Sequence, residues 1–489
     1  MSAISQAPVS RIVPLECTAD GRSFGEDVKA RAPSVTPLVA VLLATALFAV
    51  AISLHALKLN GSPYHRWGWR DMPMLWTYPF IVPCAIPFFL AQRVYRRNPG
   101  RVTLALGLLM VSTFALMVSS AAAQRKPPGP GPIVGVVISD NFSGYFSQAV
   151  ELKAAGLTVR QWLAKFPSLL PTFTNHPRIK PPGPILYNTF FVELFGAGKF
   201  SALFSGIGIG LLAVLTVPAT YAFIRYFSGS RDAAFFGSSY LALCPCLLLI
   251  YPQLDQTYAL FTVGLTLLWA AALTKNRPAL SLAFGLLYAA AILVTYLPAV
   301  LVIFLGGFSL WKLATDRAFT LRRILGHAMI AAAGFLGFYV VLWLATQFNP
   351  IATFRVCVAM QQKNMQWLEP RGFGRHLPGT ILWDLYDFAL GSGWISFILL
   401  GSSLASRLPR ELPSPRLRIA LLCIGQFLLV AIAGLIQCET ARVWMFMLPM
   451  LMLPIGLELA RWSDRSRIAA YACLLLLTLV IYRNVAFVT

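Results

Sequence analysis

Long apolar stretches alternate with short polar connections along the chain from residue 38 onward. These stretches have the lengths that helices need to cross the roughly 30 Å hydrocarbon core of a bilayer. The pattern predicts an all-α polytopic membrane protein with about 13 transmembrane helices, within a range of about 11–14. The predicted spans are residues 38–57, 73–92, 101–122, 201–226, 233–250, 256–274, 279–297, 298–313, 325–347, 386–404, 417–437, 442–460 and 467–487.

The composition supports this class and narrows the partners. Of 489 residues, 57% are hydrophobic and only 12% are charged, which is more apolar sequence than a soluble core absorbs. The formal net charge of +22 lies in short arginine clusters between apolar stretches. This distribution indicates membrane orientation and contact with anionic lipid headgroups, so we expect no nucleic-acid partner.

Four basic clusters predict the orientation. Counting through the spans places all of them on the side of the N-terminus, which the positive-inside rule makes cytoplasmic. Residues 1–36 are polar and contain prolines, and we expect a disordered cytoplasmic tail there. The clusters are Arg93, Arg96, Arg97 and Arg101; Lys312, Arg317, Arg322 and Arg323; Arg407, Arg410, Arg416 and Arg418; and Arg461, Arg465 and Arg467.

The same count places four connections on the outer face, namely residues 123–200, 251–256, 348–385 and 437–442. The first is too long for a simple connector, and apolar periodicity over Ala149–Ala155 and Val159–Phe166 predicts two short interfacial helices in it. The aromatic and amide content of residues 348–385 fits a sugar-contacting lid or an ordinary interfacial loop. Acids gathered on one face are typical of an external active site, and here they are Asp140, Asp255, Asp384, Asp387 and Glu439.

Each candidate residue has a structural and a chemical interpretation. Asp140 follows Ser139 at the start of a predicted helix, where it acts as an N-cap or as a catalytic carboxylate. His176, Arg178 and Lys180 precede a rigid proline run, where they either snorkel at the membrane surface or bind a phosphate.

Two later segments carry the same alternatives. Asp255 lies in the turn Tyr251-Pro252-Gln253-Leu254-Asp255-Gln256, which is either a polar connection or an acidic site. Glu439 and Arg442 are three residues apart, so they form a structural ion pair on one helical face or contact a substrate.

The order of these motifs resembles the GT-C superfamily of integral-membrane glycosyltransferases. It is similar to the protein O-mannosyltransferase and aminoarabinose-transferase branches and to bacterial relatives with an HPPGP run. The resemblance spans roughly residues 101–460, but Asn141 stands where the family carries a second acid, and Arg178-Ile179-Lys180 separates the histidine from the proline run. The matching positions are Asp140, His176-Pro177, Lys180-Pro181-Pro182-Gly183-Pro184, Asp255, and Glu439-Thr440-Ala441-Arg442-Val443-Trp444 with Pro449.

The resemblance implies a domain organisation and an activity. Residues 37–98 are expected to be two additional N-terminal spans, and residues 99–487 a transmembrane glycosyltransferase domain that includes the outer loops 123–200 and 348–385. The implied enzyme lies in the cell (inner) membrane of a bacterium, with its active site facing the periplasm or outside. It transfers a hexosyl or pentosyl group from polyprenyl phosphate, with inversion, to a lipid, glycan or protein acceptor.

The resemblance also implies roles for individual residues. Asp140 is the expected general base. A divalent cation, Mg²⁺ or Mn²⁺, is a possible cofactor, with Asp140 and Asp255 as candidate ligands. The expected contacts to the donor phosphate come from His176, Arg178, Lys180 and Arg442, and those to the acceptor or substrate from Tyr145, Gln253, Asp255 and Glu439.

A multi-pass transporter or flippase of lipid-linked sugars is the alternative function. Transporters usually keep ionisable groups at mid-membrane along the substrate path, whereas the acids here cluster near one surface. A non-catalytic membrane scaffold is a third interpretation, and it has little use for acids and bases gathered on one face.

Overall fold

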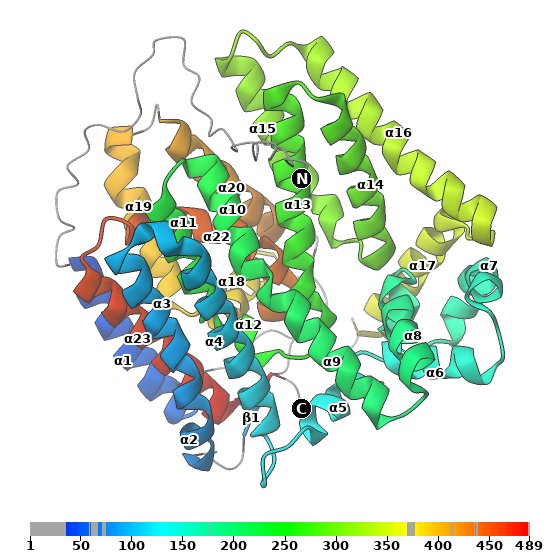
Figure 1. The fold of residues 1–489 in the computed structure, drawn as a ribbon, viewed down its shortest axis with the longest axis horizontal. Helices are drawn as coiled ribbons and strands as arrows, with labels where there is room; N and C mark the ends of the chain where they lie inside the picture. Colours follow the sequence, from blue (N-terminus) through cyan, green and yellow to red (C-terminus); the bar gives the residue numbers. More distant parts are fainter. Residues whose placement is uncertain are drawn as a thin grey trace, which may run out of the picture.

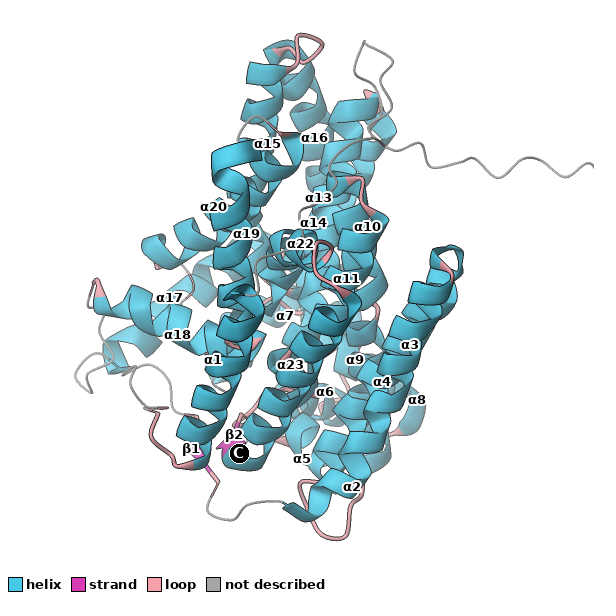
Figure 2. Cartoon of the chain, turned by 90° about the vertical axis from the view of Figure 1, so that its left-hand side faces the viewer, coloured by secondary structure: helices cyan, strands magenta, loops and turns pink. Residues whose placement is uncertain are grey.

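The fold of the chain is almost entirely helical (Figure 2). The computed structural model describes residues 36–57, 59, 67–70, 75–174, 176–368, 377–411, 414–434, 436 and 439–487. Within that part of the chain the one sheet is a two-residue ladder between β1 (Gly68–Trp69) and β2 (Val485–Ala486). The predicted tail, residues 1–36, lies outside the described residues except for Thr36.

Ten helical segments among the described residues are long and apolar enough to cross a membrane. A multi-pass membrane protein, as the hydrophobic pattern predicted, is therefore confirmed. The segments are α1 (Thr36–Ser53), η1 to α3 (Leu75–Arg97), η3 and α4 (Pro99–Ala122), α9 and α10 (Lys199–Ser228), η6 and α13 (Leu254–Lys275), η7 and α15 (Leu297–Thr315), α16 (Leu321–Thr346), α20 (Pro415–Ala433), α21 to α22 (Thr440–Leu459) and α23 (Asp464–Asn484).

Several of these segments contain short breaks in their helical geometry. Prolines near the start of the helices account for many of the breaks, because proline has no amide hydrogen to donate within a helix. The α-helices within the composite segments are α2 (Tyr78–Ile81), α3 (Ile86–Arg97), α4 (Val102–Ala122), α9 (Lys199–Val214), α10 (Thr216–Ser228), α13 (Tyr258–Lys275), α15 (Val302–Thr315), α21 (Thr440–Val443) and α22 (Leu448–Leu459).

The remaining three of the predicted spans fall on helices that are shorter or bent. Residues 233–250 fold as α11 (Arg231–Ala242) and α12 (Pro245–Leu249), interrupted at Pro245. Residues 279–297 correspond to α14 (Pro278–Val294), an apolar helix of 17 residues. Residues 386–404 divide between α18 (Gly379–Ser392) and α19 (Ile395–Glu411), which meet at an angle of 104°. Counting that bent pair as one span raises the total to 11.

The long segment after α4 holds more helix than the periodicity predicted. The two expected interfacial helices are present as α6 (Tyr145–Ala154) and α7 (Val159–Leu169). Two others flank them, α5 (Gly131–Ile138) and α8 (Gly183–Phe195), each with a proline in its first turn, where its missing amide hydrogen costs nothing. Residues 348–385 are not mainly a loop either, because α17 (Pro350–Leu368) and the start of α18 occupy most of them.

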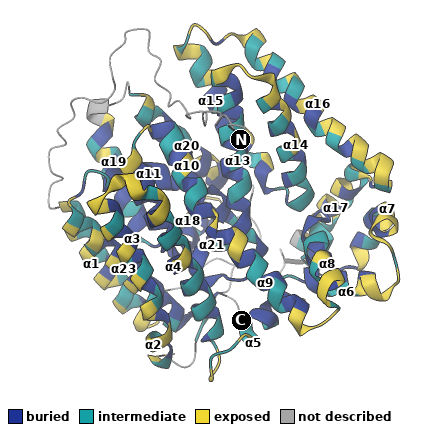
Figure 3. Ribbon diagram, viewed as in Figure 1, coloured by how far each residue is buried: buried dark blue, intermediate teal, exposed yellow. Residues whose placement is uncertain are grey.

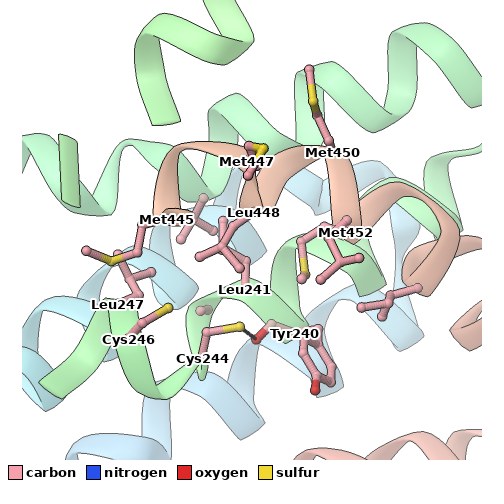
Figure 4. Close-up of a cluster of buried hydrophobic side chains, with 14 of the residues drawn as sticks. Tyr240, Leu241, Cys244, Cys246, Leu247, Met445, Met447, Leu448, Met450 and Met452 are labelled. Carbon is pink, nitrogen blue, oxygen red and sulfur yellow. Dashed lines mark hydrogen bonds between the residues drawn. The ribbon is translucent and has the colours of Figure 1, made fainter. Parts of the chain in front are cut away.

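The centre of the fold is α22, all of whose residues are buried. It packs against α10, α11, α19 and α20 (Figure 1). Figure 4 shows part of this core, where Tyr240 and Leu241 of α11 and Cys246 of α12 belong to one apolar cluster with the methionines of η9 (Trp444–Met447) and α22. Flexible thioethers fill irregular core space well. This packing fixes the position of α21, which immediately precedes η9.

The periphery has the exposed apolar side chains expected of a lipid-facing surface. Figure 3 shows many exposed residues along α16, and the exposed side chains there include Met329 and Val341. In water such a surface would be unfavourable, whereas hydrocarbon solvates it.

The N-terminal spans pack directly on the C-terminal helix. β1 pairs antiparallel with β2, with Gly68 opposite Ala486 and Trp69 opposite Val485. The α1 helix packs against α23 and α19, and α3 packs against α4. The described residues between 37 and 98 are thus integrated into the bundle. Figure 2 shows β1, β2 and α5 at one end of it, opposite the α15–α16 connection.

Candidate functional site

Ionisable side chains from four distant segments come together near the ends of α6 and α13. Asp255 and Arg442 both act electrostatically on Tyr145, and the same two residues act on Lys180 and His176. We call this group the polar cluster, and its members are Tyr145, His176, Lys180, Asp255, Glu439 and Arg442. All six were predicted as substrate-contacting residues, and the fold brings them together.

The segment that carries His176 and Lys180 is held by close packing on both sides. His176 precedes the single turn η5 (Pro177–Ile179), after which Lys180 has an extended backbone. Upstream, a Cβ atom on Gly144, the N-cap of α6, would lie 2.3 Å from Oγ1 of Thr174. Downstream, a Cβ atom on Gly183 would lie 2.6 Å from the Leu293 carbonyl oxygen at the end of α14. Both positions therefore require glycine for steric reasons.

Asp255 and the pair Glu439–Arg442 enter from the ends of two spans. Asp255 lies in η6 (Leu254–Thr257), where the chain turns into α13. Glu439 is the N-cap of α21 and has a left-handed backbone, with φ at 47°. Its carboxylate is 2.5 Å from a terminal guanidinium nitrogen of Arg442, so the predicted ion pair is present. The Arg442 side chain is only 15% exposed.

Burial and neighbouring charges shift the protonation of the cluster. Burial lowers the pKa of Lys180. The negative charge of Asp255 raises this pKa and partly offsets burial, whereas the positive charge of Arg442 lowers it further. Burial and the charge of Arg442 lower the pKa of His176 below its ordinary value, so its imidazole is neutral at pH 7. Burial, assisted by the charge of Asp255, raises the pKa of Tyr145. Tyr145 therefore keeps its hydroxyl proton and remains a hydrogen-bond donor.

Several polar groups of the cluster have no partner within the described part of the chain. The side chains of His176, Lys180 and Asp255 make no hydrogen bond or ion pair there. The Nε atom of Arg442 is buried and also lacks a hydrogen-bond acceptor. Leaving a buried donor unsatisfied costs about 1–3 kcal/mol. Donors in this state are suited to an anionic ligand, which supplies the missing acceptors.

The α17 helix packs against η5, in the segment that carries His176 and Lys180. Arg178 donates a hydrogen bond to the side-chain amide oxygen of Asn364 on α17. The thiol of Cys357 lies 3.6 Å from the Lys180 carbonyl oxygen and accepts from the hydroxyl of Tyr296 at 3.8 Å. The sequence interpretation placed Arg178 among the phosphate contacts. In the structure one terminal nitrogen of its guanidinium bonds α17, and its buried Nε atom has no hydrogen-bond partner among the described residues.

The hydrogen bonds of Asp140 and Gln253 go to residues outside the six of the polar cluster. Asp140 is exposed and accepts a hydrogen bond from the hydroxyl of Ser147 within α6. Gln253 is buried at the N-cap of η6, and its backbone amide donates to the Ile250 carbonyl oxygen at 3.1 Å. Asp140 is not among the charges that act on His176 or Lys180.

Asp387 on α18 supports the cluster, a role that the sequence did not reveal. Its side chain is buried and accepts from the backbone amide of Ala441 at 3.0 Å and from the hydroxyl of Thr440 at 3.2 Å. These two residues directly follow Glu439. The signal in the sequence was an acid in an otherwise apolar segment, which is costly to bury unless its oxygens are bonded.

A metal site made of protein ligands alone is not found among the residues that the structure describes. Within the part of the chain that the structure describes, no three His, Cys, Asp or Glu side chains are grouped to hold an ion. Asp140 is engaged by Ser147, and Asp255 acts on the cationic Lys180. We therefore assign no step to a metal.

Comparisons with known proteins give one structural likeness. No protein-family model and no curated protein matches the chain. Among solved structures, the chain is similar to ArnT from Cupriavidus metallidurans, whose crystal structure is of the form bound to undecaprenyl phosphate. The TM-score is 0.49 and the sequence identity 16%, and the match covers 74% of this chain and 61% of that chain.

Proposed function

We propose that the chain is a membrane glycosyltransferase of the GT-C type that uses a sugar donor linked to polyprenyl phosphate. The observation that carries this proposal is the set of unpaired donors in the polar cluster, above all Lys180 and the buried Nε atom of Arg442. Arg442 lies at the start of the apolar segment Thr440–Leu459, where the headgroup of a lipid-linked substrate would be, and Lys180 belongs to the same polar cluster. The order of motifs along the sequence supports the same assignment.

Lys180 and Arg442 would bind the phosphate of the donor. A phosphodiester carries one negative charge, and it offers oxygen acceptors to the ammonium group and to the free guanidinium nitrogen. Neutral His176 would add one hydrogen bond from its ring. The carboxylate of Glu439 is already paired with Arg442. It would therefore hold the guanidinium group in place, and its negative charge would be offset rather than repel the phosphate.

The proposed reaction is a single displacement at the anomeric carbon. A hydroxyl group of the acceptor forms the new bond to that carbon while the bond from carbon to phosphate oxygen breaks. The electron pair leaves with polyprenyl phosphate, whose growing negative charge Lys180 and Arg442 would stabilise. The acceptor proton passes to a carboxylate, and the configuration at the anomeric carbon inverts.

The sequence and the geometry of the polar cluster favour different carboxylates as the general base. The order of motifs assigns it to Asp140, whose carboxylate is exposed and bonded to Ser147. The geometry favours Asp255, because its charge acts on Lys180, His176 and Tyr145 and its side chain has no bonded partner among the described residues. A base must lie within hydrogen-bond reach of the hydroxyl that it deprotonates. Tyr145 would then contact the acceptor.

Transfer assays with matched variants test the proposal. Purified protein in nanodiscs would be given radiolabelled polyprenyl-phosphate sugars, and donor consumption would be compared for wild type, Asp140→Asn and Asp255→Asn. We expect donor consumption in the wild type and its loss, by at least a hundredfold, in the variant that removes the base. Loss in Asp255→Asn alone assigns the base to Asp255, and loss in Asp140→Asn alone assigns it to Asp140. Unchanged turnover in both variants contradicts the proposed mechanism.

The transport alternative makes a different prediction in the same preparation. A flippase would move labelled lipid between the leaflets of a proteoliposome without breaking the bond between sugar and phosphate. Leaflet exchange with an intact donor would therefore replace the transferase proposal.

A further inference from the structure

A cavity of about 630 Å³ lies between α3, α11 and the turn that joins α22 to α23. It is at the opposite end of the bundle from the polar cluster. The α3 helix ends beside this cavity, and α4 then runs back for 21 residues toward α5 and α6. A helix of that length is roughly 30 Å long, so the two sites lie at the levels of opposite leaflets.

Two arginines of the cavity have guanidinium nitrogens without a partner among the described residues. Arg93 lines it and makes no hydrogen bond or ion pair with any described residue. Arg96, one turn further along α3, touches Asp464 with its Nε atom at 2.7 Å, and its side chain is 70% exposed. The terminal nitrogens of both guanidinium groups are therefore open to a ligand.

Arg467 and the acids of the cavity are already occupied. Arg467 donates to the Leu459 and Trp462 carbonyl oxygens at 3.1 and 2.7 Å and stacks over the Phe236 ring at 3.8 Å. Asp464 is paired with both Arg96 and Arg467. Asp232 accepts a hydrogen bond from the hydroxyl of Tyr95 at 2.7 Å. With three arginines against two aspartates, the lining keeps a net positive charge.

The rest of the lining is aromatic and opens toward an apolar surface. Phe89 and Trp462 belong to the wall. Ile468 also lines the cavity and is 37% exposed. On α3, Ile86 and Leu90 are 58% and 44% exposed on the stretch that leads to Arg93. A ligand with its charge at the arginines would thus meet an apolar surface on its way into the bilayer.

We propose that this cavity binds the phosphodiester headgroup of an anionic phospholipid from the leaflet on the N-terminal side of the protein. Arg93 and Arg96 would bind the phosphate oxygens, and the acyl chains would follow the exposed apolar residues of α3 and α23. Its volume lies within the range of ordinary ligand sites. A soluble phosphate ester has the same charge but gains nothing from the apolar surface. The proposal does not depend on the glycosyltransferase assignment.

Lipid binding by the intact protein tests this site. Native mass spectrometry would measure retention of phosphatidylglycerol and of phosphatidylcholine by wild type and by two double variants. Arg93→Ala with Arg96→Ala removes the cavity charges, whereas Arg97→Ala with Arg101→Ala removes the same charge from exposed residues of the same connection that do not line it. We expect about a tenfold loss of phosphatidylglycerol affinity in the first variant and less than a twofold change in the control.

Two further measurements keep the test decisive if loss of the Arg96–Asp464 contact disturbs folding. Arg93→Ala alone breaks no hydrogen bond or ion pair with any described residue and should still weaken phosphatidylglycerol binding. Asp232→Asn removes a negative charge from the cavity and should strengthen it severalfold. Equal losses in the two double variants, or equal binding of both lipids, would overturn the proposal. Competition by glycerol phosphate at the affinity of the lipid would also overturn it and would indicate a soluble ester as the ligand.

Discussion

Trp67 donates its indole N–H to the carboxylate of Asp387, which lies 320 positions further along the chain. The same carboxylate accepts from Thr440 and Ala441, the two residues that follow Glu439. One buried acid therefore joins the segment before β1 to the turn that presents Glu439 and Arg442. The N-terminal spans, which the sequence suggested were an addition, contribute to the support of the candidate site.

Replacing Asp387 should destabilise the protein strongly. Asp387→Ala takes the shared acceptor from the Trp67 and Ala441 donors, whereas the Thr440 hydroxyl keeps its bond to the Asp384 carbonyl oxygen at 2.6 Å. We expect a loss of about 2–4 kcal/mol in unfolding free energy. Asp387→Asn keeps one acceptor oxygen and should lose less. Denaturant unfolding in detergent would measure both, with exposed Glu151→Ala as the control, for which we expect under about 0.5 kcal/mol. An unchanged midpoint for Asp387→Ala would exclude the supporting role.

The contribution of Asp387 shows what the sequence alone could not provide. Hydrophobic periodicity predicted most spans, because a membrane helix depends on apolar length, a local property. The order and sidedness of the motifs placed the six residues of the polar cluster on one face, but they placed Asp140, Arg178 and Gln253 there as well. The partners of Asp387 and of Arg178 lie 320 and 186 positions away, and only tertiary packing determines such pairs.

The departures in the outer segments have local causes. Residues 348–368 contain amides and charges that suggested a loop, yet α17 forms because it packs against η5 and α7. The proline run at residues 181–184 was expected to hold its neighbours rigidly, and it also starts α8, since proline is favoured in a first turn. Asp140 matched the family motif by position, but position does not report the hydrogen bond from Ser147.

Lys180 should contribute more to phosphate binding than other lysines near the outer segments. Lys180→Met removes an ammonium group with no partner among the described residues, and we expect polyprenyl phosphate to bind about 10- to 100-fold more weakly. Lys165→Met on α7 is the matched control, because that lysine is exposed and its side chain makes no hydrogen bond or ion pair with any described residue. Native mass spectrometry of the lipid complex would compare the variants. Equal affinities for both would remove Lys180 from the phosphate site.

Binding of polyprenyl phosphate should depend on pH through His176. Burial and Arg442 hold the pKa of this imidazole below 6.5, so it is neutral in the free protein at pH 7. A bound phosphate favours the imidazolium and raises its pKa, so affinity should increase as pH falls from about 7 toward about 5. The titration of the phosphate itself affects wild type and His176→Gln equally. The ratio of their affinities should therefore rise at acid pH, and a constant ratio would show that His176 does not face the ligand.

A glycine lies at each end of α6, and only one of them is close to η5. Comparing alanine substitutions at the two positions therefore separates the effect of the contact with η5 from that of backbone strain. Gly144 and Gly156 both have φ of 64°, so alanine at either position strains the backbone by about 1 kcal/mol. A Cβ atom at Gly156 meets nothing within 4 Å, whereas one at Gly144 would lie 2.3 Å from Thr174 and 3.2 Å from Pro177. Gly144→Ala should therefore destabilise the protein by about 1–3 kcal/mol more than Gly156→Ala, because the overpacked contact must move. The same displacement shifts His176, so Gly144→Ala should also weaken binding of polyprenyl phosphate while Gly156→Ala leaves it unchanged. Equal unfolding midpoints and equal affinities would mean that α6 does not position the η5 segment.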